Sequence, residues 1–298
     1  MVRQYKIHTN LDGTDDKVLD VTNGKVRFYQ PSNLGLQSTN NIWQSNGIGV
    51  MGTRSITQPQ IEFKLETFGE SLEENYQLMK DFINDILNQK FVTLEYQTEI
   101  FQVYADLALA DVTKTEGYGK NGTFSEKITF DIITKWYTYE NLTFEKIQNG
   151  QVLSGKSKIY GGTAPGSYKY VEGTSYTYYG ESDIDRLSRW DIKDEIFSFM
   201  GILYPQLPKT PTGVRFLDDI GNEYTAIVFK TEQLQNYILI NTDVNDEIYQ
   251  GWNGTTPLNL FPVMDFERYR TRIIEKGQME LINLAKAEFK IKRKADFI

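Results

Sequence analysis

The chain has 298 residues, of which 40% are hydrophobic and 24% charged, the composition of a globular protein with room for two domains. A net charge of −8 disfavours a DNA-binding protein, because phosphate contacts need Lys and Arg in excess. The absence of cysteine excludes disulfides, zinc ribbons and thiol nucleophiles, and a single histidine leaves little for a catalytic triad or a multi-histidine zinc site.

The N-terminal residues predict a strand and no targeting signal. His8, the single histidine, stands in the segment YKIHT (residues 5–9), where we expect a residue on the surface of a strand. No hydrophobic segment follows the first residues, and no apolar run is long enough to cross a bilayer. The sequence therefore predicts neither a secretory signal nor a membrane span.

Residues 30–60 form a long Gly- and Asn-rich stretch that is apolar in places. Long loops in compact domains usually have a function, and the apolar residues suggest a loop covered by a neighbouring subunit. Residues 47–52 (GIGVMG) match G-x-G-x-x-G, but a dinucleotide site needs a buried strand before this motif and a helix after it. Neither flanking segment fits, so we expect no nucleotide cofactor.

A helix is the clearest element of the first half. Ser71 is a good N-cap, Glu74 completes a capping box, and an apolar stripe follows at helical spacing: Leu72, Tyr76, Met79, Phe82, Ile83, Ile86 and Leu87. Alternating apolar and polar residues predict strands around this helix at residues 61–66, 91–96, 101–107 and 124–132. The helix should therefore pack against a sheet.

The second half predicts one strand after another. Short β-rich segments separated by turn residues indicate an antiparallel sandwich, with strands at residues 214–217, 224–230, 237–241, 258–261, 269–274 and 279–284. Residues 183–190 give the only helical signal of this half, and we expect the domain boundary near residues 136–139.

The C-terminal residues 287–294 (AEFKIKRK) predict a last strand with Lys290, Lys292 and Lys294 on one face. Such a basic strip could meet nucleic acid. Lysines more often protect an exposed strand edge from unwanted pairing, and we favour that interpretation.

Other residues are compatible with calcium binding, glycoside hydrolysis or sugar binding, but no motif indicates any of these functions. Acidic clusters at residues 12–16, 218–219 and 243–247 could hold a structural calcium, yet none has EF-hand spacing and the same residue types are common in turns. The 40 acidic residues do not exclude a carboxylate pair for glycoside hydrolysis, but nothing nominates one. Core packing is a commoner role than sugar stacking for Trp136, Trp190 and Trp252.

Between Ser154 and Ser182 the chain becomes a run of Tyr, Gly, Ser and Thr. Tyrosine on a short, turn-rich scaffold is typical of contact surfaces, because its ring supplies rigid area and its hydroxyl keeps that area soluble. The tract is either an arm that grips another protein or a pair of hairpins packed on its own domain. The candidate partner-binding residues are Tyr160, Tyr168, Tyr170, Tyr176, Tyr178 and Tyr179.

Four segments carry a resemblance that covers the whole chain: residues 26–31 (VRFYQP), 67–72 (TFGESL), 217–224 (LDDIGNEY) and 266–272 (FERYRTR). In these segments and in its layout the sequence resembles the distal tail proteins of siphophages that infect lactococci. None of the four segments is a catalytic signature.

The resemblance implies a structural protein, made in the host cytoplasm, at the distal end of the virion tail. It implies a mainly β fold with one α-helix: an N-terminal ring-forming β-sandwich over residues 1–135, joined by the C-terminal strand at 285–298, and a galectin-like antiparallel sandwich over 136–284 with an arm insertion at about 145–188. A homo-hexameric ring would connect the tail tube protein to the tail-tip (tail-associated) protein, DNA would pass through it, and the arm would hold receptor-binding proteins.

The chain departs from the galectins that bind β-galactosides, because its second half contains no histidine for their histidine and tryptophan motif. We therefore expect a galectin-like platform without catalytic residues or cofactors. Two other functions stay open: a carbohydrate-binding tail module that contacts host cell-wall saccharide directly, and a carboxylate-pair hydrolase.

Overall fold

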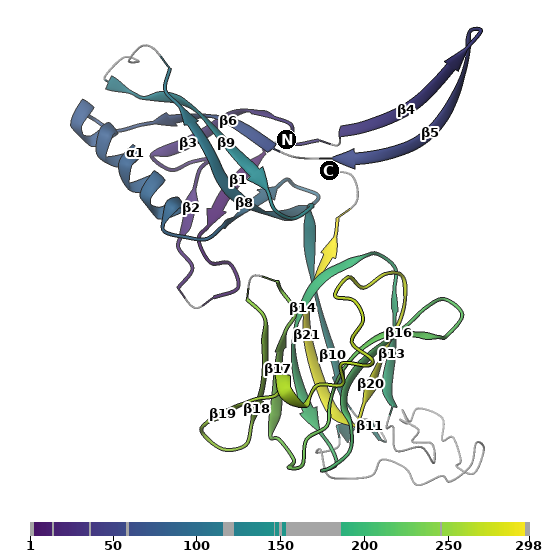
Figure 1. The fold of residues 1–298 in the computed structure, drawn as a ribbon. Coiled ribbons are helices and arrows are strands. Elements are labelled where there is room, and N and C mark those ends of the chain that lie inside the picture. The colour runs from purple at the N-terminus through teal and green to yellow at the C-terminus, as the bar shows by residue number, and fades with distance from the viewer. Residues whose placement is uncertain are drawn as a thin grey trace. The chain divides into compact units, whose positions relative to one another are not determined.

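The computed structural model describes residues 3–13, 15–35, 37–57, 60–115, 122–145, 147–148, 151–152, 186–244 and 246–295 (Figure 1). Within these ranges the chain is mainly β, and α1 (Leu72–Leu87) is its one α-helix. The predicted fold class is thereby confirmed. The chain divides into two compact units: unit 1 comprises Met1–Thr138 and Ala295–Ile298, and unit 2 comprises Tyr139–Lys294.

Unit 1 is a β-sandwich whose two sheets share one long strand, β8 (Gln102–Thr113). One sheet has the order β2-β1-β7-β8 and the other the order β3-β6-β9-β8. β8 changes partner at Leu107, which lies opposite Val92 of β7 and Ile132 of β9. The remaining strands of these sheets are β1 (Gln4–His8), β2 (Val18–Asp20), β3 (Val26–Ser32), β6 (Gln60–Thr67), β7 (Val92–Gln97) and β9 (Ser125–Ile132).

The core of unit 1 lies between these sheets. Tyr5 stacks on Tyr96 with ring centroids 5.2 Å apart, and it meets Phe63 edge-on at 5.4 Å. Aromatic pairs of this kind contribute about 0.5–1.5 kcal/mol beyond the area that they bury. The alternation predicted for residues 61–66 is realised in β6, where Ile61, Phe63 and Leu65 are buried.

Helix α1 begins where the sequence predicts it. The Ser71 hydroxyl accepts a hydrogen bond from the Glu74 N–H at 3.1 Å, while the Glu74 carboxylate accepts one from the Glu70 N–H at 2.7 Å. In a capping box the Glu74 carboxylate would accept from the N–H of the N-cap residue Ser71, but here it accepts from the N–H of the preceding residue, Glu70. Figure 1 shows α1 alongside β3 and β6, and Phe82 and Ile86 enter the core from this helix.

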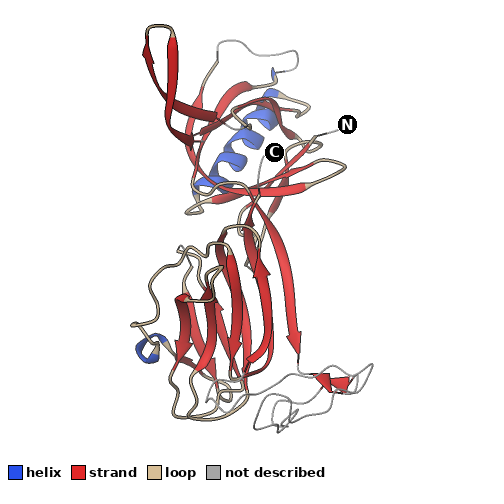
Figure 2. Cartoon of the chain, turned by 90° about the vertical axis from the view of Figure 1, so that its right-hand side faces the viewer, coloured by secondary structure: helices blue, strands red, loops and turns tan. Residues whose placement is uncertain are grey.

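Unit 2 is a second antiparallel sandwich (Figure 2), with sheet orders β19-β18-β17-β14-β21-β10 and β13-β20-β15-β16. Phe199, Phe216 and Phe289 meet in the core between the sheets. The six-stranded sheet contains β10 (Tyr137–Glu145), β14 (Ile196–Pro205), β17 (Tyr237–Asn241), β18 (Ile248–Trp252), β19 (Pro257–Asn259) and β21 (Leu284–Lys294). The other sheet contains β13 (Arg186–Ile192), β15 (Thr212–Leu217), β16 (Glu223–Phe229) and β20 (Gly277–Ile282).

Three short elements complete the described chain. β11 (Ile147–Gln148) pairs with β12 (Gln151–Val152), and the 3-10 helix η2 (Phe261–Val263) follows β19. β10 begins in unit 1, where Tyr137 pairs with Tyr104 of β8.

β21 differs from two sequence-based expectations. Residues 285–298 were expected to join the N-terminal domain, but β21 pairs with β14 from Leu284 to Arg293 and belongs to unit 2. Ala295 returns to unit 1, where its N–H donates to the Trp136 carbonyl at 2.8 Å. β21 also lies between β14 and β10, so its lysines do not protect an exposed edge.

The helical signal at residues 183–190 is also corrected. Residues 183–185 lie outside the described ranges, and Arg186–Ile192 form β13, which pairs antiparallel with β20. Trp190 and Ile192 pack on the core of unit 2. Burial of these side chains and pairing with β20 therefore override a weak local helical pattern.

Candidate interaction surfaces

A long β-hairpin replaces the loop expected at residues 30–60. β4 (Gln37–Ser45) pairs with β5 (Ile48–Thr57), and the two strands project from the rest of unit 1 (Figures 1 and 2). Asn46 and Gly47 form its two-residue turn with φ angles of 51° and 78°, the left-handed values that a type I′ turn requires. The glycine-rich motif is therefore a hairpin turn and a strand, not a phosphate loop.

The hairpin exposes apolar side chains on both of its faces. Residues directly opposite each other share a face, so Ile42 and Met51 lie on one face and Trp43 and Val50 on the other. Their exposed fractions range from 50% for Met51 to 69% for Trp43, and Ile48 beside the turn is 71% exposed. Clusters of this kind mark interaction sites in soluble proteins.

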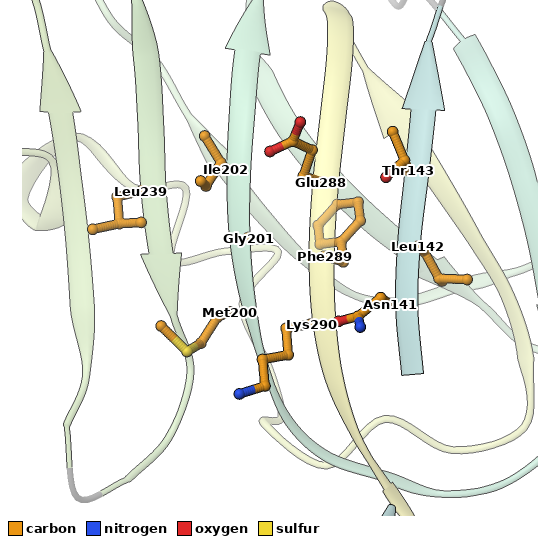
Figure 3. A pocket seen from close by; sticks show the side chains of 10 residues that line it. All are labelled: Asn141, Leu142, Thr143, Met200, Gly201, Ile202, Leu239, Glu288, Phe289 and Lys290. Carbon is orange, nitrogen blue, oxygen red and sulfur yellow. The ribbon is translucent and has the colours of Figure 1, made fainter. Parts of the chain in front are cut away.

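The outer face of the six-stranded sheet in unit 2 is hollowed over β10, β14, β17 and β21 (Figure 3). The hollow has a volume of about 320 Å³ and an apolar part made by Met200, Ile202 and Leu239. Its charged groups are engaged within the unit. Glu288 pairs with Lys286 at 2.5 Å, and the Lys290 ammonium lies 4.0 Å from the centre of the Tyr139 ring.

An aromatic row continues this face toward β18. Tyr237 stacks on Trp252 with ring centroids 5.7 Å apart, and Tyr204 lies 6.5 Å from Tyr237. Trp252 is half-buried in this row, whereas Trp136 is buried in the core of unit 1 and Trp190 packs on the core of unit 2.

His8 is buried, so its expected place on the surface of a strand is wrong. Only 8% of the residue is exposed, and its two ring nitrogens face the carboxylates of Asp16 and Glu95. Glu95 stands 87 positions away in the sequence, on the strand that pairs with β1. No local sequence pattern could therefore predict the contact between His8 and Glu95.

The remaining charged motifs take part in local structure. Lys292 is 7% exposed and its ammonium pairs with Asp243 at 2.9 Å. The Asp218 carboxylate accepts hydrogen bonds from the N–H groups of Ile220 and Asn222, as turn aspartates commonly do. Across the described ranges, no three His, Cys, Asp or Glu side chains gather so that they could hold a metal ion.

The tyrosine tract was the main sequence-based candidate for partner binding. All six of its candidate residues lie outside the described residues: Tyr160, Tyr168, Tyr170, Tyr176, Tyr178 and Tyr179. In the described part of the chain, no helix has the length and apolar character needed to cross a membrane.

Two β-sandwich units and a projecting hairpin with exposed apolar side chains are compatible with a structural protein that acts through contacts with other chains. Two family models match nearly the whole chain, "Distal tail protein, N-terminal domain" over residues 4–133 and "Dit, C-terminal domain" over residues 135–298. The chain belongs to the distal tail protein (Dit) family. This family is structural rather than enzymatic, and its place in the virion is the baseplate at the tail tip.

Known relatives agree over the full length. The chain is 93% identical to the distal tail protein of Lactococcus phage p2 and 91% identical to that of Lactococcus phage SK1, with 100% of each chain covered. A chain in the solved phage P2 baseplate in its activated conformation with Ca is 93% identical, with a TM-score of 0.78 over 100% of both chains. The Dit protein of phage SPP1 is 10% identical, with a TM-score of 0.55 over 99% of this chain and 100% of that one, so it shares the fold alone.

Proposed function

We propose that this chain is the hub of a phage tail tip, where a homo-hexameric ring connects the tail tube protein to the tail-associated protein. The ring domain is the N-terminal one, unit 1, and the galectin-like platform is unit 2, with β21 as one of its strands. Membership of a baseplate family supports this role. A net charge of −8 suits a passage through which DNA must slide without adhering.

The proposal of a ring rests mainly on the β4–β5 hairpin. A closed ring needs head-to-tail interfaces, in which one surface of each subunit meets a different surface of the next. Strands of this length reach about 30 Å at ~3.3 Å per residue, far enough to extend over a neighbour. The apolar side chains on both faces of the hairpin can then be buried between the two copies, at a gain of about 1.5–3 kcal/mol for each large side chain.

The tyrosine tract supports the second part of the proposal, in which an arm at residues 145–188 holds receptor-binding proteins. Its composition, rich in Tyr with Gly and Ser, is that of protein contact surfaces. This role does not depend on the hairpin, so ring formation and receptor-binding-protein capture are separable properties of the chain.

The mass of the full chain in solution tests the ring. Light scattering over a range of protein concentrations should give six times the mass of one chain. A monomer that persists at high concentration would contradict the ring but would leave the family assignment untouched.

The aromatic row favours one other candidate function, direct binding of host cell-wall saccharide. The stacked pair Tyr237 and Trp252, beside the hollow on the same sheet face, is a surface on which a sugar ring could lie. A glycan array with the full chain and its Trp252→Ala variant distinguishes the two functions. A hub gives no signal with either protein, whereas a sugar-binding module gives a signal that the variant loses.

A further inference from the structure

The single histidine lies in unit 1 among charged side chains, of which Glu95 is buried and Lys6 and Asp16 are partly exposed. His8 ends β1, opposite Thr93 of β7 and Val18 of β2. Lys6 lies two residues before it, so its side chain projects from the same face of the strand. We call Lys6, His8, Asp16 and Glu95 the His8 cluster.

Both nitrogens of the His8 ring face carboxylate oxygens. Nδ1 lies 2.6 Å from Asp16 Oδ2, and Nε2 lies 2.8 Å from Glu95 Oε2. An ionised carboxylate can only accept hydrogen bonds, while a neutral imidazole has a single N–H to donate. The imidazolium form, with two N–H groups, is the one that satisfies both contacts at once.

Glu95 is held as an ionised acceptor. Burial alone would raise the pKa of Glu95, but hydrogen bonds from Lys6 and His8 outweigh burial and bring the pKa below its ordinary value of 4.5. The Lys6 ammonium reaches Glu95 Oε1 at 2.9 Å, and the Glu95 side chain is only 5% exposed. Glu95 would therefore keep one cationic partner if His8 lost its proton.

Asp16, unlike Glu95, is partly exposed to solvent. Its side chain is 18% exposed, so water can solvate it, and its Oδ1 accepts the Asn10 N–H at 3.0 Å. Asp16 thereby connects the turn after β1 to His8. The same turn is closed by hydrogen bonds between Thr9 and Lys17, and the Lys17 ammonium pairs with Asp85 of α1 at 2.5 Å.

The other groups on this face add negative charge or none. The Tyr104 ring of β8 lies 6.4 Å from the His8 ring, and burial together with the Glu95 charge raises the pKa of Tyr104. Asp106 of β8 accepts hydrogen bonds from Thr93 and Tyr137. Within the His8 cluster two cations balance two anions, and loss of the histidine proton leaves an excess of negative charge.

We propose that His8 is a pH-dependent latch for the turn that carries Asp16. As the imidazolium, His8 donates to Asp16 and holds this turn on the sheet of unit 1. When the pH rises and the ring gives its proton to water, the remaining N–H stays with buried Glu95, and Asp16 separates into solvent with its turn.

Nuclear magnetic resonance of the full chain tests the latch, because a protein with one histidine gives unambiguous ring ¹⁵N signals. A pH titration follows the passage from a ring with both nitrogens protonated to a ring with one protonated nitrogen. The exchange protection of the Asn10 amide, corrected for intrinsic exchange, should fall in step with the loss of the ring proton, because the Asn10 N–H donates to Asp16 Oδ1.

Matched variants separate the latch from a merely structural contact. His8→Gln, which cannot become charged in this range, should show low Asn10 protection that does not vary with pH. Asp85→Asn removes the neighbouring ion pair of Lys17 without touching His8 and should keep the wild-type pH dependence. Asn10 protection in the wild type that stays flat while the ring loses its proton would overturn the proposal.

Discussion

Trp43 lies directly opposite Val50 in the β4–β5 hairpin, and the two side chains are 69% and 63% exposed on the same face. On the other face Ile42 and Met51 form a second exposed pair. A two-stranded ribbon is at best marginally stable in water without a further surface to pack on. This pairing is therefore expected to matter for assembly more than for the stability of one chain.

Replacing Trp43 and Val50 together by serine should prevent ring formation. The loss of two large apolar side chains removes several kcal/mol from each interface, at about 1.5–3 kcal/mol per side chain, and a ring repeats that loss at every contact. Light scattering should report monomers at a concentration where the wild type is assembled. The circular dichroism spectrum and the unfolding midpoint of the monomer should hardly change.

Ile220→Ser is the matched control for this variant. Ile220 is 83% exposed, but it stands alone in the turn after β15 in unit 2. An isolated exposed apolar residue is ordinary on a protein surface. Assembly should be unaffected by this change, and equal loss of assembly in both variants would argue against a specific hairpin interface.

Changing the six tyrosines of the tract to serine should abolish co-purification with the receptor-binding protein and leave the ring intact. The reason is that tyrosine rings supply large, rigid contact area in such surfaces. The matching phenylalanine variant keeps the ring area and should retain part of the binding. A pull-down in which the serine variant binds like the wild type would remove the arm assignment.

Arg215→Met should destabilise unit 2 by up to about 3–5 kcal/mol, because it removes a cation that contacts the buried Glu280 carboxylate. Glu280 is fully buried, and the Arg215 guanidinium contacts it at 2.6 Å and 2.8 Å. Urea unfolding at fixed protein concentration measures the effect. The double variant with Glu280→Met should recover most of the loss, since it also removes the buried carboxylate.

Arg268→Met provides the comparison. Arg268 also holds a carboxylate with two hydrogen bonds, but its partner Glu223 is 25% exposed. Water can solvate that carboxylate after the change, so we expect a cost of about 1 kcal/mol or less. Similar losses in the Arg215 and Arg268 variants would show that burial does not set the energetics of these pairs.

Glu95 should contribute to the acid sensitivity of unit 1. Its pKa is lower in the folded state than the ordinary 4.5, so the unfolded chain binds the proton more readily. The stabilisation by the Glu95 carboxylate is therefore present above the unfolded pKa and is lost as the pH falls through the folded pKa. Unfolding curves between about pH 7 and pH 3 should show Glu95→Gln approaching the wild type at the acid end.

Glu73→Gln, on the exposed side of the first turn of α1, is the control for this measurement. Its difference from the wild type should stay small throughout the pH range, because exposed charges contribute little. A Glu95→Gln difference that is constant with pH would mean that the variant disturbs packing and not the charge balance.

Sequence patterns predicted the secondary-structure elements that depend on residues close together in the sequence. The Ser71 cap and the apolar stripe after it give α1, and period-two alternation gives β6 because Ile61, Phe63 and Leu65 all point into one core. The β4–β5 hairpin was missed although Asn46–Gly47 is a strong hairpin signal. Its tip is apolar on both faces, so the alternation that normally identifies a half-buried strand is absent there.

The sequence by itself determined the β-rich class, the start of α1 and the resemblance to a family, because these depend on neighbouring residues or on overall likeness. Only the tertiary structure decided that β21 is a central strand, that Lys292 is buried against Asp243 and that His8 lies between two carboxylates. The physical reason is common to all three. Strand neighbours and ion-pair partners come from segments far apart along the chain, and their contacts leave no periodic trace in either segment.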